Sequence, residues 1–239
     1  MGGPFFAGLA WLFITGALCL LSAYGLKHVA LRLLSRAFGT GFALGLYAML
    51  TLPGFFLHEG SHALAALLLR VPIRGITFIP HHSPLNLSVE AGVQVASTDR
   101  LRMALIALAP LLTGTIVLGL LSGALGTAGP DPLPWVRLRD RLISLEWGGA
   151  GFWIMLYLMW ALGTHMAPSR GDMVYVQGGA VALLVLLLAL GLLLSLLGGT
   201  ITDQVGAFLG RLGDGLFIGT ALNGVILLPL FIIAGLLRR

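Results

Sequence analysis

Long apolar stretches separated by short polar segments run along the whole chain. A helix needs about 20 apolar residues to cross the hydrocarbon core of a bilayer. Six stretches approach or exceed that length, namely residues 4–26, 39–69, 101–126, 148–166, 178–198 and 216–236. The pattern therefore predicts an all-α integral membrane protein with about six transmembrane helices. The second stretch is longer than one crossing needs, and Pro53 predicts a kink inside it.

The segments between these stretches have patterns of their own. Residues 71–98 join a β-rich GITFI to an alternating LSVEAGVQVA through a turn-like PHHSPLN, which predicts a small membrane-associated β-hairpin. Residues 131–147 carry tryptophans around arginines, as membrane-interface segments do. Residues 199–215 are rich in glycine and are predicted to be a loop that contains Asp214.

Composition agrees with a membrane location. The chain is 58% hydrophobic and 10% charged, whereas soluble domains are about 25% charged. The formal charge of +5 comes from scattered basic residues, so we expect contact with a lipid bilayer and no nucleic-acid partner. The 14 Lys and Arg divide equally between the two sets of loops, so the positive-inside rule predicts no orientation. We expect a multi-pass protein of the plasma membrane.

Three ionisable side chains lie inside the second apolar stretch, in the sequence HEGSH. His58 and His62 are four residues apart and share one face of a helix, so both rings can bind one Zn²⁺. Glu59 can then act as general base toward a water on the metal. Helix-packing histidines are the alternative, but ionisable groups inside a span are costly and usually functional.

A catalytic zinc site takes three protein ligands and leaves one position open. Two acidic residues next to apolar stretches are candidates for the third ligand. Asp172 follows the break at Pro168, and Asp214 precedes the sixth stretch. Asp172 has an alternative role as the N-cap of the fifth helix.

The stretch HEGSHALAALLLRVPIRGITF resembles the site-2 protease family of intramembrane zinc metalloproteases. In that family the motif helix is followed by a short β-rich segment and by a span with an Ala-Gly-Pro-like element, to which Ala107–Gly114 is similar without the Gly. The break from His165 to Pro168 resembles the family's Asn-x-x-Pro element, with His165 in place of Asn. Asp172 follows one residue earlier than usual, and Met173 replaces the usual Gly.

This resemblance covers residues 39–178 and implies a function for the site. Asp172 would be the third ligand of a zinc ion held by His58 and His62. Glu59 would be the catalytic base, and His165 would donate a hydrogen bond to the developing oxyanion. A buried histidine bonded to a carbonyl at a helix break is the alternative for His165.

We therefore expect residues 1–239 to form one polytopic membrane domain, with a core at 39–178 and accessory helices in 1–38 and 179–239. The expected function is an intramembrane zinc metalloprotease that cuts membrane-anchored proteins or peptides in or near their transmembrane segments. The alternative is a non-proteolytic metal-binding membrane protein, a transporter or scaffold that retains the motif. The sequence specifies neither the substrate nor possible partner subunits.

Two further expectations concern polar contacts. A sheet edge within residues 71–98 could accept an unwound substrate as an added strand, because a helical substrate hides its amides; the alternative is a purely structural hairpin. Asn223, which is polar inside the sixth stretch, is expected to hydrogen-bond to a neighbouring helix.

Overall fold

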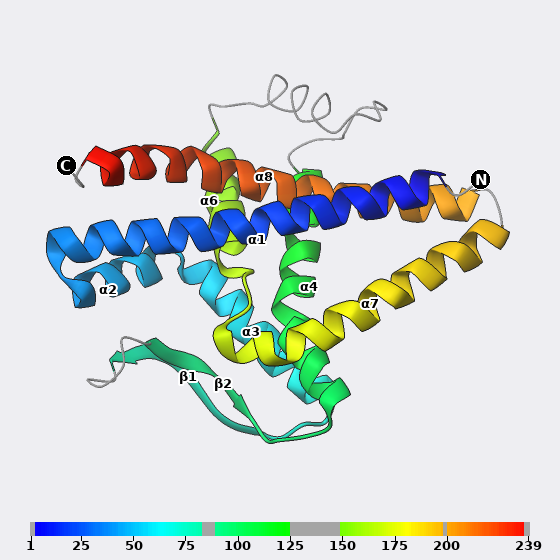
Figure 1. The fold of residues 1–239 in the computed structure, drawn as a ribbon, viewed down its shortest axis with the longest axis horizontal. Coiled ribbons are helices and arrows are strands. Elements are labelled where there is room, and N and C mark those ends of the chain that lie inside the picture. The colour runs from blue at the N-terminus through cyan, green and yellow to red at the C-terminus, as the bar shows by residue number, and fades with distance from the viewer. Residues whose placement is uncertain (1–2, 83–88, 125–148, 198–199, 237–239) are drawn as a thin grey trace.

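The computed structural model describes residues 3–82, 89–124, 149–197 and 200–236, most of them helical (Figure 1). In chain order the elements are α1 (Gly3–Phe38), α2 (Thr40–Leu50), α3 (Leu52–Leu68), β1 (Ile73–His82), β2 (Val89–Val95), α4 (Arg100–Ala124), α6 (Ala150–His165), α7 (Arg170–Leu197) and α8 (Thr200–Leu236). The predicted helical class and the small sheet after the motif helix are confirmed. The predicted interface segment at 131–147 lies outside the described residues.

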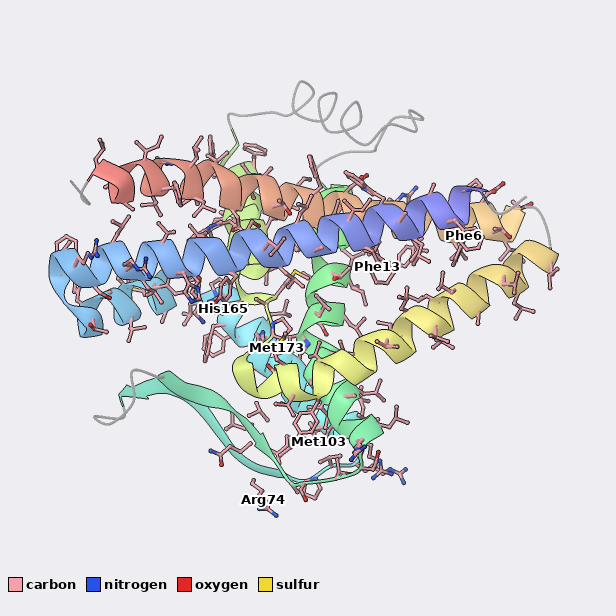
Figure 2. All side chains as sticks on the ribbon, viewed as in Figure 1. Phe6, Phe13, Arg74, Met103, His165 and Met173 are labelled. Carbon is pink, nitrogen blue, oxygen red and sulfur yellow. The ribbon has the colours of Figure 1, made fainter. Side chains whose placement is uncertain are left out.

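Three of the described helices, α1, α4 and α8, are long and apolar enough to cross a membrane. Helices α2 and α3 would add a fourth crossing if the bent pair counts as one broken span. Helix α6 has 16 residues, and the apolar stretch Leu183–Leu194 in α7 is also shorter than a crossing. Large apolar side chains such as Phe6 and Phe13, on the side of α1 turned toward α7 (Figure 2), are each 42% exposed. These features indicate a membrane protein, while six crossings stay a prediction.

The second apolar stretch breaks between α2 and α3, whose axes differ by 78°. Pro53 lies in the first turn of α3, where its missing N–H has no helical partner to lose. Thr51 is the residue between the two helices, and its hydroxyl donates to the carbonyl of Tyr47 at 2.8 Å. The predicted kink is therefore a sharp break that starts a new helix, and this helix carries the HEGSH motif.

Helices α1 and α8 lie side by side and run in the same direction, while α4 and α6 run across them (Figure 1). Small residues allow the pair to approach closely. A Cβ added to Gly206 would lie 2.6 Å from the backbone carbonyl of Pro4, and one added to Gly8 would lie 2.3 Å from the carbonyl oxygen of Gly206. These close contacts hold α1 and α8 together as a pair. Because α4 runs across that pair (Figure 1), the long apolar helices do not share one direction.

The predicted loop at 199–215 is wrong, because its described residues, 200–215, form the first four turns of α8. Their glycines lower intrinsic helix propensity, but they lie where α8 meets other elements. A Cβ on Gly213 would lie 2.5 Å from the Trp11 ring, and one on Gly215 would lie 2.5 Å from the Leu118 backbone. Close packing against α1 and α4 thus overrides the turn-like composition.

Asn223 makes the contact between helices that its position predicted. Its Nδ2 donates to Ser22 Oγ on α1 at 3.2 Å, and the side chain is fully buried. A polar side chain buried among apolar helices gains stability from such a bond because hydrocarbon offers no other partner.

Strands β1 and β2 pair antiparallel, with Ile76 opposite Val93. The pairing of the strands continues beyond their ends, where the Ala96 N–H donates to the Pro72 carbonyl at 2.9 Å. The next helix begins just after Asp99, whose carboxylate accepts the Arg102 backbone N–H at 3.0 Å. This bond holds the pKa of Asp99 below its usual range. Ile73 and Val95 pack against Ala66 of α3 and Ile106 of α4, so the sheet is held against both helices.

The contact between α1 and α8 predicts different outcomes for two glycines one turn apart on α8. Gly206→Ala should lower the stability of the protein by about 1–3 kcal/mol, because the new methyl group meets backbone that cannot move aside. Gly210→Ala should be neutral or stabilising, since nothing lies within 4 Å of its Cβ position. Denaturation of both variants in detergent measures the difference, and equal stabilities would contradict the packing described here.

Candidate metal centre

Helix α3 supplies three side chains of the site from consecutive turns. His58 and His62 are one helical turn apart, so their rings lie on one face, and their Nε2 atoms are 3.3 Å from each other. Glu59 is the next residue after the first histidine, and all three residues are buried. The spacing of the motif therefore places the two rings together, as predicted.

Asp172 approaches the histidines from the first turn of α7. Its Oδ1 lies 3.5 Å from His62 Nε2, and its Oδ2 lies 3.8 Å from His58 Nε2. Asp172 also completes a reciprocal cap with Ser169, the residue before α7. The Ser169 N–H donates to Asp172 Oδ2 at 2.8 Å, and the Asp172 N–H donates to Ser169 Oγ at 3.2 Å. Ser169 thus holds the N-cap position considered for Asp172, and the cap orients Asp172 toward the histidines.

The three donor groups have the spacing that a tetrahedral metal requires. Ligands at about 2.0–2.1 Å from a zinc ion occupy corners of a tetrahedron whose edges are about 3.3 Å. The observed separations of 3.3, 3.5 and 3.8 Å lie close to that edge. Among the described residues, His58, His62 and Asp172 form a group whose ligand atoms all lie within 4.8 Å of one another. This group could hold a metal ion.

Backbone carbonyls fix the tautomer of both rings. His58 Nδ1 is 2.6 Å from the His165 carbonyl, and His62 Nδ1 is 2.8 Å from the Ile106 carbonyl. A carbonyl only accepts, so each Nδ1 carries a proton, and in the neutral ring each Nε2 then presents a lone pair. Two lone pairs 3.3 Å apart repel each other unless a cation or a proton lies between them. This is the ligand arrangement of metal-binding histidines, with the second ring nitrogen held by an oxygen acceptor.

Glu59 lies between the donor group and the sheet. Its Oε2 accepts the backbone N–H of Val93 on β2 at 3.0 Å. The metal group and Glu59 open into a cavity of about 210 Å³. Its other lining residues come from β2, α4 and the start of α7, namely Gly92, Val93, Val95, Met103, Ile106, Ala107, Ser169, Gly171 and Tyr175. The carboxylate is thus held at the cavity, next to the metal group.

The ring of His165 does not face this cavity. Its Nε2 lies 2.6 Å from the hydroxyl of Thr51, which already donates its proton to Tyr47, so the ring nitrogen is the donor. His165 ends α6 near α2 (Figure 2) and is not among the residues that line the cavity. The geometry therefore provides no contact for the expected oxyanion role. His165 contributes its backbone carbonyl to the site, through the bond to His58.

Asp214, the other candidate for the third ligand, lies elsewhere. It is buried on α8, where its Oδ1 accepts a hydrogen bond from the Trp11 Nε1–H at 3.0 Å. It is not part of the group formed by His58, His62 and Asp172. Of the two candidate acids, Asp172 therefore lies beside the histidines and Asp214 does not.

Sequence reasoning missed the backbone groups that complete the site. The carbonyls of Ile106 and His165 and the N–H of Val93 contact the motif, yet their side-chain identities carry no chemical signal. Comparisons with protein-family models, with curated proteins and with solved structures each found no match. The interpretation of the site therefore rests on its own geometry.

Removal of the Asp172 carboxylate should abolish metal binding. Asp172→Ala leaves two ligands, so zinc in the purified protein should fall from about one equivalent per chain to under about a tenth. Asp203→Ala, an exposed acid on α8, is the matched control and should keep its zinc. Metal analysis of both variants decides the point, and stoichiometric zinc in Asp172→Ala would rule out this residue as a ligand.

Proposed function

We propose that this protein is a multi-pass intramembrane zinc metalloprotease that hydrolyses peptide bonds of membrane-anchored proteins in or near their transmembrane segments. One observation carries the proposal. The Nε2 atoms of His58 and His62 and the carboxylate of Asp172 converge at tetrahedral spacing beside Glu59. Three protein ligands with an adjacent carboxylate are the composition of catalytic zinc sites, whereas structural zinc sites have four protein ligands.

The donor set favours zinc among common metals. Two imidazoles and one carboxylate at tetrahedral spacing match the His₂-carboxylate set of zinc hydrolases, while Mg²⁺ and Ca²⁺ prefer six or more oxygen ligands. When bound, zinc would polarise a carbonyl oxygen and lower the pKa of a coordinated water toward 7. Glu59 would accept the proton of the attacking water and return it to the leaving amine.

The surroundings of the site favour a substrate that is itself in the membrane. Helix α3 exposes apolar side chains close to the motif, including Phe56 at 48% and Leu64 at 55%. These side chains lie on the face of α3 opposite the buried ligands, so the helix that carries the site suits a lipid environment, where membrane-anchored chains are found. The resemblance of the motif, the following β-rich segment and the Pro168–Asp172 break to the site-2 protease family supports the same function.

The sheet offers a place for the substrate backbone. Strand β2 lines the cavity, and its Val93 N–H points at Glu59 rather than at β1. A substrate segment added along this edge would be extended, and its scissile amide would be released from helical hydrogen bonds. We therefore propose that β2 holds the unwound substrate beside the metal.

The central experiment replaces the general base and keeps the ligands. Glu59→Gln should retain about one equivalent of zinc but lower the cleavage rate by about 10²–10⁴-fold, the usual contribution of a general base. Cleavage of membrane-anchored candidate substrates in liposomes and zinc content are measured on the same preparations. The wild-type protein is the reference for both measurements.

Three results distinguish the alternatives. Zinc retained with cleavage lost supports the protease. Zinc bound by the wild type with no cleavage of any membrane-anchored candidate would favour a non-proteolytic metal-binding protein, either a transporter or a scaffold. Equal cleavage by wild type and Glu59→Gln would contradict the role of Glu59.

The role of the sheet is tested separately. Ile76 lies directly opposite Val93, so the fixed φ and the ring of Ile76→Pro distort β1 where it supports β2 beside the site. Cleavage should fall at least about tenfold while zinc stays bound, because the ligands lie on helices. Ser97→Pro, two residues beyond the end of β2, is the control. Unchanged cleavage by Ile76→Pro would leave the sheet with a structural role alone.

A further inference from the structure

The two carbonyls that hold the ligand histidines share an unusual origin. In a regular α-helix, the carbonyl of residue i accepts the N–H of residue i+4. Ile106 lies inside α4, and the residue four positions later is Pro110, which has no N–H. The Ile106 carbonyl therefore lacks its ordinary helical donor, and it accepts the Nδ1–H of His62 at 2.8 Å instead.

The His165 carbonyl, which accepts the hydrogen bond from His58, also lacks its ordinary helical donor. His165 is the last residue of α6, and its helical donor would be Ser169. Pro168 disfavours continuation of the helix through the residue before it. The Ser169 N–H donates to Asp172 Oδ2 at 2.8 Å, and the His165 carbonyl accepts from His58 Nδ1 at 2.6 Å. Each histidine is thus oriented by a carbonyl that lacks its helical donor, and in each case a nearby proline is the reason.

We propose that Pro110 is a positioning residue of the metal centre. Its missing N–H leaves the Ile106 carbonyl available to hold His62 in the tautomer that presents Nε2 to the metal. This inference rests on the metal site of the proposed function, and it adds a determinant of metal affinity that contacts neither metal nor substrate. A bond from a ligand histidine to an oxygen acceptor commonly contributes 10–100-fold to metal affinity or activity, in order of magnitude.

The placement of Pro110 supports a specific role rather than a break in the helix. Helix α4 continues as one helix from Arg100 to Ala124 on both sides of the proline. Proline is the residue least favourable in a helix interior, so its presence calls for a compensating contact. The buried bond between Ile106 and His62 is such a contact, because a histidine Nδ1–H without an acceptor would be costly at this depth.

Two substitutions restore the N–H at position 110 and differ in side-chain volume. Pro110→Ala leaves space, whereas Pro110→Val keeps about the volume of the ring. In both, the new N–H bonds the Ile106 carbonyl and draws it toward the helix axis, which weakens its bond to His62. Both should lower Zn²⁺ affinity about tenfold, measured against a competing chelator, and both should change the visible absorption of bound Co²⁺.

Pro229 provides the matched control. It is also inside a membrane-type helix, α8, and the carbonyl four residues earlier belongs to Val225, which is 72% exposed and not part of the metal site. Pro229→Ala should therefore keep the Zn²⁺ affinity and the Co²⁺ spectrum of the wild type. Thermal denaturation in detergent should show all three variants folded, since each substitution removes a helix-disfavouring residue.

The outcomes separate the inference from the proposed function. Affinity within twofold of wild type in both Pro110 variants would overturn the inference, as would a loss in Pro110→Ala that Pro110→Val restores, which would indicate packing. A wild type that binds Zn²⁺ but cleaves nothing would contradict the proposed protease function. The comparison of Zn²⁺ affinities would then still test the role of Pro110. A wild type that binds no Zn²⁺ would overturn both.

Discussion

The mutual repulsion of two histidine lone pairs is the constraint on which the site depends. Because both Nδ1 atoms donate to carbonyls, the Nε2 atoms of neutral His58 and His62 rings face each other with lone pairs 3.3 Å apart. An arrangement of this kind is stable only with positive charge between the rings. Asp172 adds a negative group at the same point, so the site is built to attract a cation.

Several elements of the fold hold this arrangement in place. Helix α3 carries the histidines, α4 and the end of α6 supply their carbonyl acceptors, and the cap of α7 orients Asp172. Strand β2 holds Glu59 by the Val93 N–H. Helices α1 and α8 pack against each other along their lengths, α8 contacts both α4 and α6, and α1 contacts α6 (Figure 1). The ligands are therefore fixed by backbone groups of well-formed helices, which suits a site that must keep its geometry in an apolar environment.

Part of this organisation is readable in the sequence. Apolar length predicted the helical membrane class, the β-alternation after the motif predicted the hairpin, and Asn223 predicted a bond between helices. The loop expected at 199–215 was wrong, because the glycines of α8 serve close packing against α1 and α4, and composition does not distinguish a packed glycine from a turn. The number of membrane crossings was also not decided, since α6 and the apolar part of α7 are short.

For the site, the sequence by itself determined His58, Glu59 and His62, because a four-residue spacing on a helix is a local rule that needs no knowledge of the fold. It left Asp172 and Asp214 open, since the distance between residues more than a hundred positions apart depends on how the helices pack. Tertiary structure alone decided that Asp172 meets the histidines, that the His165 ring faces Thr51, and that the Ile106 carbonyl is aimed at His62. Backbone groups look identical at every position in a sequence, so only their placement in space gives them a role.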